Sequence, residues 1–329
     1  MKIAFTGAGY IINIHAQAAA KLQDVELFAI VNRSSEKTRG LARKFNIQQQ
    51  FETVEQLLAA SGVDVLVIGT PNYLHASQAI TALKAGVHVL VEKPMAMNAQ
   101  EACQMVASSQ ESGALLMVAH CWRFDPEVLW LRQQVDAGRL GKIIRTKGYG
   151  VHTHWGPSGW FTEKKYAGGG AMADVGIHAL DTARFLLNDP QPESVYARIG
   201  TYYTPQDVDD TGILIVNWDN GAVSYIESGW WQPHADGPEA ATQLYGTAGF
   251  GQIYPTYLQQ QSEKIDPGFP YPRIDHAPQS LYNEQMNYFI QCIRQNHQPN
   301  PGALEGWINM KIIDAAYKSS TTGQVVKVE

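Results

Sequence analysis

Asp174 and His178 are four residues apart and follow three consecutive glycines, Gly168, Gly169 and Gly170. On a helix this spacing places the carboxylate and the imidazole on one face. A histidine with a pKa near neutrality can take the proton of an alcohol, while the aspartate orients the ring or binds a neighbouring hydroxyl. The glycines permit close approach of the backbone to a ligand. An exposed pair that adds about 0.2–0.5 kcal/mol to helix stability is the commoner outcome of this spacing.

Lys93 is the further reactive group that favours the chemical interpretation. It stands between Glu92 and Pro94, directly after the apolar run 87–91, so we expect it at the carboxyl end of a strand. The proline after it keeps its backbone extended. Partial burial would lower the pKa of the ammonium group toward the range useful for proton transfer or for a hydrogen bond to a substrate oxygen. A solvated loop lysine is the alternative. Only the presence of Asp174 and His178 in the same chain favours a catalytic role for Lys93.

Short apolar runs alternate with amphipathic stretches over residues 1–121 and predict βαβ units around a doubly wound parallel sheet. The expected strands are 2–6, 25–31, 63–68, 87–91 and 115–118. The expected helices are 14–22, 35–45, 54–60, 75–85 and 98–112, with Asn98 as the N-cap of the last one. An α/β domain of this kind would hold Lys93 at the edge of its sheet.

Residues 122–329 follow a different pattern. After a helix expected at 126–137, runs of period two are found at 142–151, 195–203, 212–218 and 222–229, with Asp219-Asn220-Gly221 as a turn between the last two. These runs predict a mainly antiparallel sheet, and a helix at 172–187 is expected to cover one face. A loop at 266–278 and helices at 281–295 and 303–319 complete this second, α+β domain.

Gly7 and Gly9 lie at the turn between the first expected strand and helix. Glycine permits a tight bend there and lets a dinucleotide pyrophosphate reach the helix N-terminus. The pair alone is a weak signal, since Ile12 replaces the third glycine of G-x-G-x-x-G and two close glycines also mark ordinary turns. Thr70 and Pro71 follow the strand expected at 63–68, at the sheet edge where such folds bind ligands. A plain turn would use the same residues, so their position favours cofactor binding.

The end of the second expected strand carries Asn32, Arg33 and Ser34, where an acidic residue normally accepts the ribose hydroxyls of NAD. A cation and small polar groups suit the 2′-phosphate of NADP better. We therefore expect NADP(H) to be favoured, with NAD(H) as the alternative. A turn that caps the following helix would also explain these residues.

Composition excludes several classes of partner. With 329 residues, 45% hydrophobic content and a net charge of −6, the chain is long enough for two domains and has no excess of positive charge for nucleic acid. Its three cysteines are widely spaced and fit neither a disulfide framework nor a zinc site. A strand expected from residue 2 leaves no room for a signal segment, and no run approaches a membrane span of ~18 apolar residues. We expect a cytoplasmic protein.

The chain resembles the glucose-fructose oxidoreductase, inositol dehydrogenase and rhizopine catabolism (Gfo/Idh/MocA) family over essentially its whole length. The resemblance rests on Gly7-Ala8-Gly9 with His15, Thr70-Pro71-Asn72 with His75, Glu92-Lys93-Pro94, Arg123-Phe124-Asp125-Pro126, and the segment from Gly168 to Asp181. It implies an N-terminal Rossmann domain at residues 1–121. It also implies a substrate-binding and oligomerisation domain at residues 122–329, with a large open-faced sheet that pairs subunits into homodimers or homotetramers.

The resemblance implies that Lys93 and His178 are the catalytic pair and that Asp174 contacts the substrate, in agreement with the roles given above. The expected cofactor-binding residues are Gly7, Gly9, Tyr10, Ile11, Asn32, Arg33, Ser34, Thr70, Pro71, Asn72, His75, Glu92 and Lys93. The expected substrate contacts are Arg123, His152, Trp155 and Trp160. Two positions depart from the family pattern. Ile12 stands where a small residue is usual, which changes how closely the first helix packs on the pyrophosphate. Asn32 stands where many NAD-using relatives have an acidic residue.

Aromatic residues are frequent in the second domain, and Trp155 and Trp160 lie near the two histidines His152 and His154. Aromatic faces beside polar donors suit a pyranose or cyclitol ring, which has an apolar C–H face and a rim of hydroxyls. Packing within the sheet or between subunits is the equal alternative. A metal site at the two histidines lacks a third ligand in sequence reach, so we expect no metal.

These residues predict an NAD(P)-dependent dehydrogenase or reductase acting on CH–OH groups. The expected reaction moves a hydride between the nicotinamide and a secondary carbinol carbon of a sugar, a sugar derivative or a cyclitol. One alternative is a glycosidase that retains NAD and oxidises its substrate transiently. The other is a non-catalytic NAD(P)-binding sugar sensor, against which the presence of Lys93, Asp174 and His178 together argues.

Overall fold

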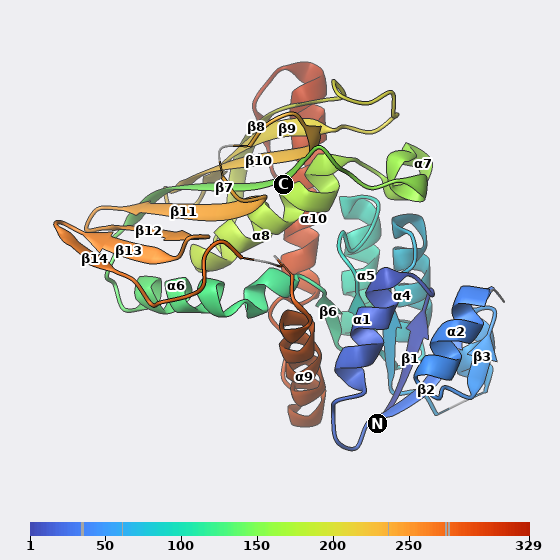
Figure 1. Ribbon diagram of the computed structural model, residues 1–329. Helices are drawn as coiled ribbons and strands as arrows, with labels where there is room; N and C mark the ends of the chain where they lie inside the picture. Colours follow the sequence, from blue (N-terminus) through green and yellow to red (C-terminus); the bar gives the residue numbers. More distant parts are fainter. Residues whose placement is uncertain (34–35, 61, 236, 274, 276) are drawn as a thin grey trace. The chain divides into compact units, whose positions relative to one another are not determined.

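The structure is a computed structural model that describes residues 1–33, 36–60, 62–235, 237–273, 275 and 277–329 (Figure 1). It contains two units: Met1–Cys121 with Pro278–Trp307, and Trp122–Ala277 with Ile308–Glu329. The change between residues 121 and 122 falls where the sequence pattern changes. The return of Pro278–Trp307 to the first unit differs from the simple division at residue 121, which placed this segment in the second domain.

The first unit is built on a six-stranded parallel sheet in the order β3-β2-β1-β4-β5-β6. Its strands are β1 (Lys2–Thr6), β2 (Glu26–Val31), β3 (Gln49–Phe51), β4 (Val65–Ile68), β5 (His88–Val91) and β6 (Leu116–Val118). All four residues of β4 are buried, as expected for a parallel strand with helices on both faces. The strand order reverses between β1 and β4, and ligands of open α/β sheets bind beyond the carboxyl ends of the strands at such a point.

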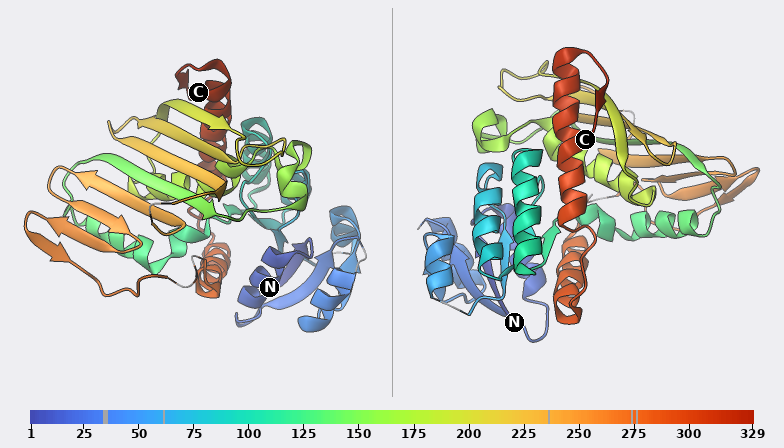
Figure 2. Two further views of the ribbon diagram at one scale, coloured as in Figure 1. Left: turned by 45° about the horizontal axis from the view of Figure 1, so that its top comes forward. Right: turned by 180° about the vertical axis from the view of Figure 1, so that it is seen from behind.

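The helices of the first unit cover both faces of this sheet. They are α1 (Tyr10–Ala19), α2 (Glu36–Lys44), α3 (Val54–Ala59), the 3₁₀ turn η1 (Asn72–Leu74), α4 (His75–Lys84), α5 (Ala99–Ser112) and α9 (Gln279–Gln295). α1 and α9 lie side by side on one face, and α4 and α5 lie side by side on the other (Figures 1 and 2). The predicted cap of α5 is confirmed, since Asn98 accepts a hydrogen bond from the backbone N–H of Glu101 at 2.9 Å.

The packing of α9 explains why Pro278–Trp307 belongs to the first unit. Gln279 Nε2 donates to the backbone oxygen of Ile14 in α1 at 3.1 Å. Leu281 and Phe289 of α9 are almost fully buried. Burial of an apolar helix face is the main source of helix stability in a protein, and α9 finds that burial on the first unit.

The second unit is built on a nine-stranded mixed sheet in the order β14-β13-β12-β11-β7-β10-β9-β8-β15. Its strands are β7 (Ile143–Thr153), β8 (Pro192–Gly200), β9 (Thr211–Trp218), β10 (Val223–Gln232), β11 (Ala240–Gly246), β12 (Phe250–Ile253), β13 (Tyr257–Gln260), β14 (Glu263–Ile265) and β15 (Val326–Lys327). Adjacent strands are antiparallel except for β7 and β10. β10 follows β7 in the chain only after several helical segments and two strands, and such an indirect connection permits parallel pairing.

Helices cover one face of the nine-stranded sheet. The 3₁₀ turns η2 (Cys121–Phe124) and η3 (Gly159–Thr162) and the short α7 (Lys164–Ala167) lie in its connections. α6 (Pro126–Asp136), the π-helical turn η4 (Met172–Gly176) and α8 (Ile177–Leu186) pack on the sheet. In the part of the chain that the structure describes, no helix covers the opposite face, which is turned toward the viewer on the left of Figure 2. Residues 172–187, which were expected to form a single helix, form the π turn η4 followed by α8.

α10 (Ala303–Thr322) is the longest described helix, with 20 residues. The division between the units falls within it, between Trp307 and Ile308. Asn309 and Ser319 are buried polar residues on this helix, and Ser319 Oγ accepts from the backbone N–H of Ala197 in β8 at 3.0 Å. Among the residues described, no helix is both long enough and apolar enough to cross a membrane.

Candidate active site

Gly7 and Gly9 form a turn whose shape requires glycine at one position and leaves space at the other. Gly7 has a φ of +94°, and a Cβ there would lie 2.8 Å from the backbone oxygen of Gly69 at the end of β4. Gly9 is the N-cap of α1, and a Cβ on it would meet no atom within 4 Å. No side chain of the described chain caps α1, and its first turn contains no acidic residue. The N-terminus of α1 therefore fits the pyrophosphate of a dinucleotide.

Ile12 fills the position at which the dinucleotide-binding pattern has its third glycine. Its side chain is fully buried, and a Cβ on Gly69 would lie 2.6 Å from Ile12 Cδ1 and 3.0 Å from Ile11 Cγ2. The third glycine normally allows close packing of the helix on the strands. Here the missing side chain at Gly69 provides that space, so Ile12 is accommodated. Tyr10, in contrast, is 81% exposed at the start of α1.

Asn32 and Arg33 lie at the carboxyl end of β2. Asn32 Nδ2 donates to Thr38 Oγ1 in α2 at 2.8 Å, and Thr38 Oγ1 donates to the backbone oxygen of Arg33 at 3.5 Å. Arg33 is exposed. These bonds orient the amide of Asn32 within the turn. Ser34, also expected to bind the cofactor, lies outside the described residues.

His75 connects the two loops that follow β4 and β5. Its Nε2 lies 2.8 Å from the backbone oxygen of Thr70, and its Nδ1 lies 2.9 Å from the backbone oxygen of Pro94. The ring is almost completely buried, and this burial lowers the pKa of His75. Thr70 Oγ1 also donates to Gln78 Oε1 at 3.0 Å. Pro71 precedes η1, and η1 begins at the buried Asn72. The bond from His75 to Thr70 holds the ends of the turn that is expected to face the cofactor.

Glu92 and Lys93 follow β5, next to β4 in the sheet. Glu92 is 8% exposed, and its Oε1 lies 2.7 Å from Nε2 of His15 in α1. Its Oε2 accepts from the backbone N–H of Lys93 at 3.2 Å. A buried carboxylate needs such partners, since removing one partner of a buried pair typically costs about 3–5 kcal/mol. Glu92 thereby fixes the backbone from which the half-buried Lys93 projects at the carboxyl edge.

Asp174 and His178 belong to the second unit and are both half-buried. Asp174 lies in the π turn η4 and His178 in the first turn of α8. A π turn is wider than the α-helical 3.6 residues per turn, so each of its residues contributes less rotation. The four residue positions from Asp174 to His178 pass through η4 and α8 and together rotate the backbone by close to one full turn. The two side chains are therefore expected on the same face of the helix. π turns inside helices are frequent at functional sites.

The ring of His178 is oriented by an aromatic neighbour from the same unit. Trp122 stacks on it with ring centroids 4.9 Å apart and an interplanar angle of 21°. Close contacts also fix the helix itself: a Cβ on Gly150 of β7 would lie 2.9 Å from the backbone oxygen of Val175, which is in η4. The stacking on Trp122 holds the ring plane of His178, and the contact at Gly150 holds the helical segment that carries it.

Arg123, expected to contact the substrate, is 2% exposed and is held inside the second unit. Its Nε and Nη2 donate to the two carboxylate oxygens of Asp181 at 2.8 Å each, and Nη1 and Nη2 donate to Asp189 at 3.1 and 2.9 Å. These two carboxylates hold the pKa of Arg123 above its usual range despite burial. The guanidinium is engaged within the fold, and we therefore do not propose Arg123 as a substrate contact.

His152 and Trp155 stack at the end of β7 with ring centroids 3.6 Å apart. Side chains alternate along a strand, so His152 projects on the same side of β7 as Gly150, which packs against η4. Trp155 remains 46% exposed. Trp160 stacks on Phe161 in η3. The structure thus brings His152 and Trp155 together and places Trp160 in a second aromatic pair.

Two family models match the chain within residues 1–250. Residues 1–120 match the model described as the oxidoreductase family with NAD-binding Rossmann fold, and residues 128–250 match the GFO/IDH/MocA C-terminal domain. The chain belongs to the Gfo/Idh/MocA family. The expected fold is confirmed by the six-stranded Rossmann sheet and the mixed open-faced sheet. The chain is accordingly an oxidoreductase with an NAD-binding Rossmann domain.

Several similar proteins are named for reactions on sugars or sugar derivatives. The 1,5-anhydro-D-fructose reductase of Ensifer adhaerens is 27% identical over 98% of this chain and 97% of the relative. The D-glucoside 3-dehydrogenase of Escherichia coli K12 is 26% identical over 100% of this chain and 97% of the relative. A levoglucosan dehydrogenase in complex with NADH and levoglucosan superposes with a TM-score of 0.89 at 23% identity, covering 100% of this chain and 99% of that one. At that identity the likeness shows the fold alone.

Several contacts of the site were not apparent from the sequence. The hydrogen bond between Glu92 and His15 joins residues 77 positions apart, and His75 joins two loops through backbone oxygens that any residue carries. Asp209 was also missed; its carboxylate accepts hydrogen bonds from the backbone N–H groups of Gly170 and Met172, just before Asp174. Its only sequence signal is its place beside Asp210 at the start of a strand.

Proposed function

We propose that the chain transfers a hydride between NAD(P) and a secondary carbinol carbon of a sugar, a sugar derivative or a cyclitol. The observation that supports this most is that Asp174 and His178 lie four residues apart in one continuous helical segment, with the ring of His178 stacked on Trp122. The relatives add the substrate class, since they are named for anhydrosugar, glucoside and inositol reactions. Lys93, which follows β5 at the carboxyl edge of the Rossmann sheet, is the third residue that we propose for the reaction.

In the oxidising direction, the neutral imidazole of His178 takes the hydroxyl proton as the carbinol C–H bond breaks. A bound NAD(P) would supply the hydride acceptor, so that the alcohol would lose a hydride and a proton and become a carbonyl group. Lys93 hydrogen-bonds the substrate oxygen and stabilises the negative charge that develops on it. Asp174 binds a neighbouring hydroxyl and thereby fixes which carbon is presented. General acid–base groups of this kind typically contribute about 10²- to 10⁴-fold in rate.

We propose that the cofactor lies along the carboxyl edge of the first sheet. The pyrophosphate would bind at the N-terminus of α1 beside Gly7, Gly9, Tyr10 and Ile11. The two loops joined by His75 would border the nicotinamide. Asn32 and the exposed Arg33 favour NADP(H), because a guanidinium can pair with the 2′-phosphate and no carboxylate is present at this turn among the described residues.

We propose that His152, Trp155 and Trp160 form the substrate side of the second unit. The exposed face of Trp155 offers an apolar surface for the C–H face of a ring. The stacked ring of His152 carries nitrogen atoms that can bond hydroxyls at the rim of that ring. A sugar or cyclitol presents both kinds of surface together, which is why this class fits better than an open-chain apolar alcohol.

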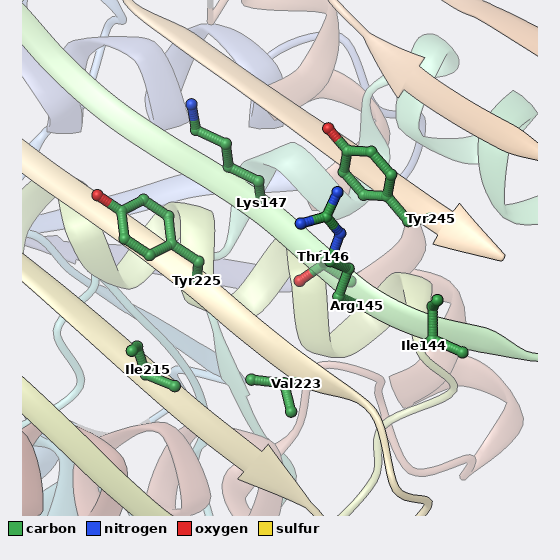
Figure 3. Close-up of a pocket in the computed structure, with 8 residues that line it drawn as sticks. All are labelled: Ile144, Arg145, Thr146, Lys147, Ile215, Val223, Tyr225 and Tyr245. Atoms are coloured by element: carbon green, nitrogen blue, oxygen red, sulfur yellow. The ribbon is translucent and has the colours of Figure 1, made fainter.

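We also propose a homodimer or homotetramer formed through the open face of the nine-stranded sheet. A hollow of about 600 Å³ on this face is lined by Arg145, Lys147, Ile215, Tyr225 and Tyr245, among others (Figure 3). The hollow combines the exposed apolar side chains of Ile144 and Val223 with the cations of Arg145 and Lys147, and a two-fold pairing would place this same face on both subunits. Sedimentation of Tyr225→Glu, with Gln110→Glu on the exposed surface of α5 as the control, would test this pairing.

The proposed function is tested by a substrate panel. Purified protein is mixed with NADP or NAD and with sugars, sugar glycosides and inositols, and the absorbance of reduced nicotinamide is followed. We expect steady reduction with at least one ring polyol and more rapidly with NADP. Cleavage of a glycoside without net cofactor reduction would instead identify a cofactor-retaining glycosidase. Binding of cofactor and sugar without any conversion would identify a sensor.

A further inference from the structure

The helical segment that carries Asp174 and His178 begins without a cap from its own neighbours. Ala171 precedes η4, and no side chain of the flanking residues bonds the first turn. The open N–H groups are instead taken by Asp209, which lies at the entrance to β9. Its Oδ1 accepts from the backbone N–H of Gly170 at 2.8 Å and its Oδ2 from that of Met172 at 2.8 Å. A carboxylate at the start of a helix both satisfies these donors and complements the helix dipole.

The backbone of Asp209 takes part as well. Its carbonyl oxygen accepts from the N–H of Ala171 at 2.8 Å. Three successive N–H groups, at residues 170 to 172, are therefore bound by one residue. Tyr317 of α10 donates its hydroxyl to Asp209 Oδ1 at 2.7 Å. Asp209 is 6% exposed, so these bonds are formed away from water, where they are strong and costly to lose.

Two of the three glycines are explained by this contact. A Cβ on Gly170 would overlap the backbone oxygen of Asp209, and a Cβ on Gly169 would overlap the hydroxyl of Tyr317. From the sequence we expect these glycines to permit the close approach of a ligand to the backbone. For Gly169 and Gly170 the structure shows a different close approach, to Asp209 and to Tyr317. Only glycine at these positions allows the carboxylate to reach the first turn.

The contact leads directly to the proposed catalytic residues. The N–H of Asp174 donates to the backbone oxygen of Gly170 at 3.0 Å, so Asp174 lies one hydrogen bond from the residue that Asp209 holds. His178 follows one turn later. A shift at the start of η4 would move both side chains together, because a helix moves as a rigid element.

We propose that Asp209 is a positioning residue for Asp174 and His178. By holding the N–H groups of residues 170 to 172, it sets where η4 begins and hence how both side chains are presented. This inference rests on the proposed function of His178, but its consequence for the histidine ring can be measured without a substrate.

The test compares Asp209→Asn with Asp210→Asn in the full-length protein. Asparagine keeps the volume of aspartate but offers only one acceptor oxygen, so one of the two N–H groups faces an amide N–H₂. Asp210 is the matched control: it is fully buried and accepts the N–H groups of Tyr202, Tyr203 and Thr204 at 2.7–2.8 Å, none of which is in η4. The first readout is the NMR titration of the His178 imidazole, assigned by its loss in His178→Gln.

We expect the chemical shifts and the titration of His178 to change in Asp209→Asn and to stay at the wild-type values in Asp210→Asn. With an active substrate, we expect kcat to fall by up to about 100-fold in Asp209→Asn while the Kd for the cofactor is unchanged, since misplacing a reacting group by ~1 Å can cost that factor. Tyr317→Phe should give a smaller change of the same kind.

The proposal is overturned if Asp209→Asn lowers the Tm as much as Asp210→Asn and leaves the titration of His178 unaltered. Asp209 would then only stabilise the fold. Failure of the proposed function would look different: the NMR change would be present in Asp209→Asn, but no substrate would be turned over by the wild-type protein.

Discussion

The side chain of Ile12 fills the space next to Gly69 in the first unit, and a Gly69→Ala substitution tests this packing. The added methyl would lie 2.6 Å from Ile12 Cδ1 and 2.9 Å from Ile12 Cγ1. Both distances are well inside van der Waals contact, and both residues are held by the close-packed junction of α1 and β4. Overpacking of this kind typically costs about 1–3 kcal/mol. In a unit of this size, a loss of ~2 kcal/mol lowers the Tm by roughly 4–8 °C.

The second half of the prediction is a double-mutant cycle. Ile12→Ala removes a fully buried side chain and is expected to cost about 2–5 kcal/mol. In the double variant the new methyl of Gly69→Ala enters the space that Ile12 leaves. We therefore expect the double variant to lose less stability than the sum of the two single variants, by about 1 kcal/mol or more. Urea unfolding followed by fluorescence gives the three differences.

The control is another glycine-to-alanine change in the same unit. Gly40 lies within α2, and a Cβ there would meet no atom within 4 Å. Gly40→Ala should raise stability by about 0.5–1 kcal/mol, because alanine loses less backbone entropy in a helix. Wild-type stability of Gly69→Ala, or strict additivity in the cycle, would refute the view that Gly69 replaces the missing third glycine.

Three further predictions concern charge and cofactor choice. Arg123→Met should destabilise the protein by about 3–5 kcal/mol because it leaves the buried carboxylate of Asp181 unpaired, measured by urea unfolding; unchanged stability with a raised KM would make Arg123 a substrate contact. Burial lowers the pKa of His88, whose Nδ1 accepts the N–H of Leu115 at 2.9 Å, so the unfolded chain binds the extra proton and stability falls as pH drops below about 6.5. His88→Asn, which keeps an acceptor but does not titrate, should flatten this part of the pH–stability curve, and an unchanged slope would exclude His88 as its source. Asn32→Asp should shift the ratio of kcat/KM values toward NAD by tenfold or more, about 1.4 kcal/mol, and an unchanged ratio would exclude this turn from cofactor selection.

The buried parallel strands could be predicted from the sequence nearly to the residue. β1, β4 and β5 contain runs of three or four apolar residues because both of their faces are covered, and these runs end at polar or glycine residues. β3 (Gln49–Phe51) was not predicted, since it is a short edge strand of two exposed glutamines and a phenylalanine. β12 to β14 were also missed, because strands of three or four residues are too short to show a clear pattern of period two.

Long-range contacts limited the prediction of the site. The types and spacing of Lys93, Asp174 and His178 were visible because each belongs to a local motif. The π turn was not, since periodicity cannot distinguish it from an α-helix over five residues. The partners of Arg123 were also out of reach, because Asp181 and Asp189 are 58 and 66 residues away. A buried arginine bound by two carboxylates and an exposed one that binds substrate have the same local sequence.

The central claim is tested most directly with a substrate from the panel that carries deuterium on the carbinol carbon. The account predicts that the deuterium appears on the reduced nicotinamide, detected by mass spectrometry, and that its transfer slows by about 10²- to 10⁴-fold in Lys93→Ala and in His178→Ala. Lys84→Ala and His297→Gln, at exposed positions outside the site, should transfer it at the wild-type rate. Deuterium lost to water, or undiminished transfer in both active-site variants, would contradict the account.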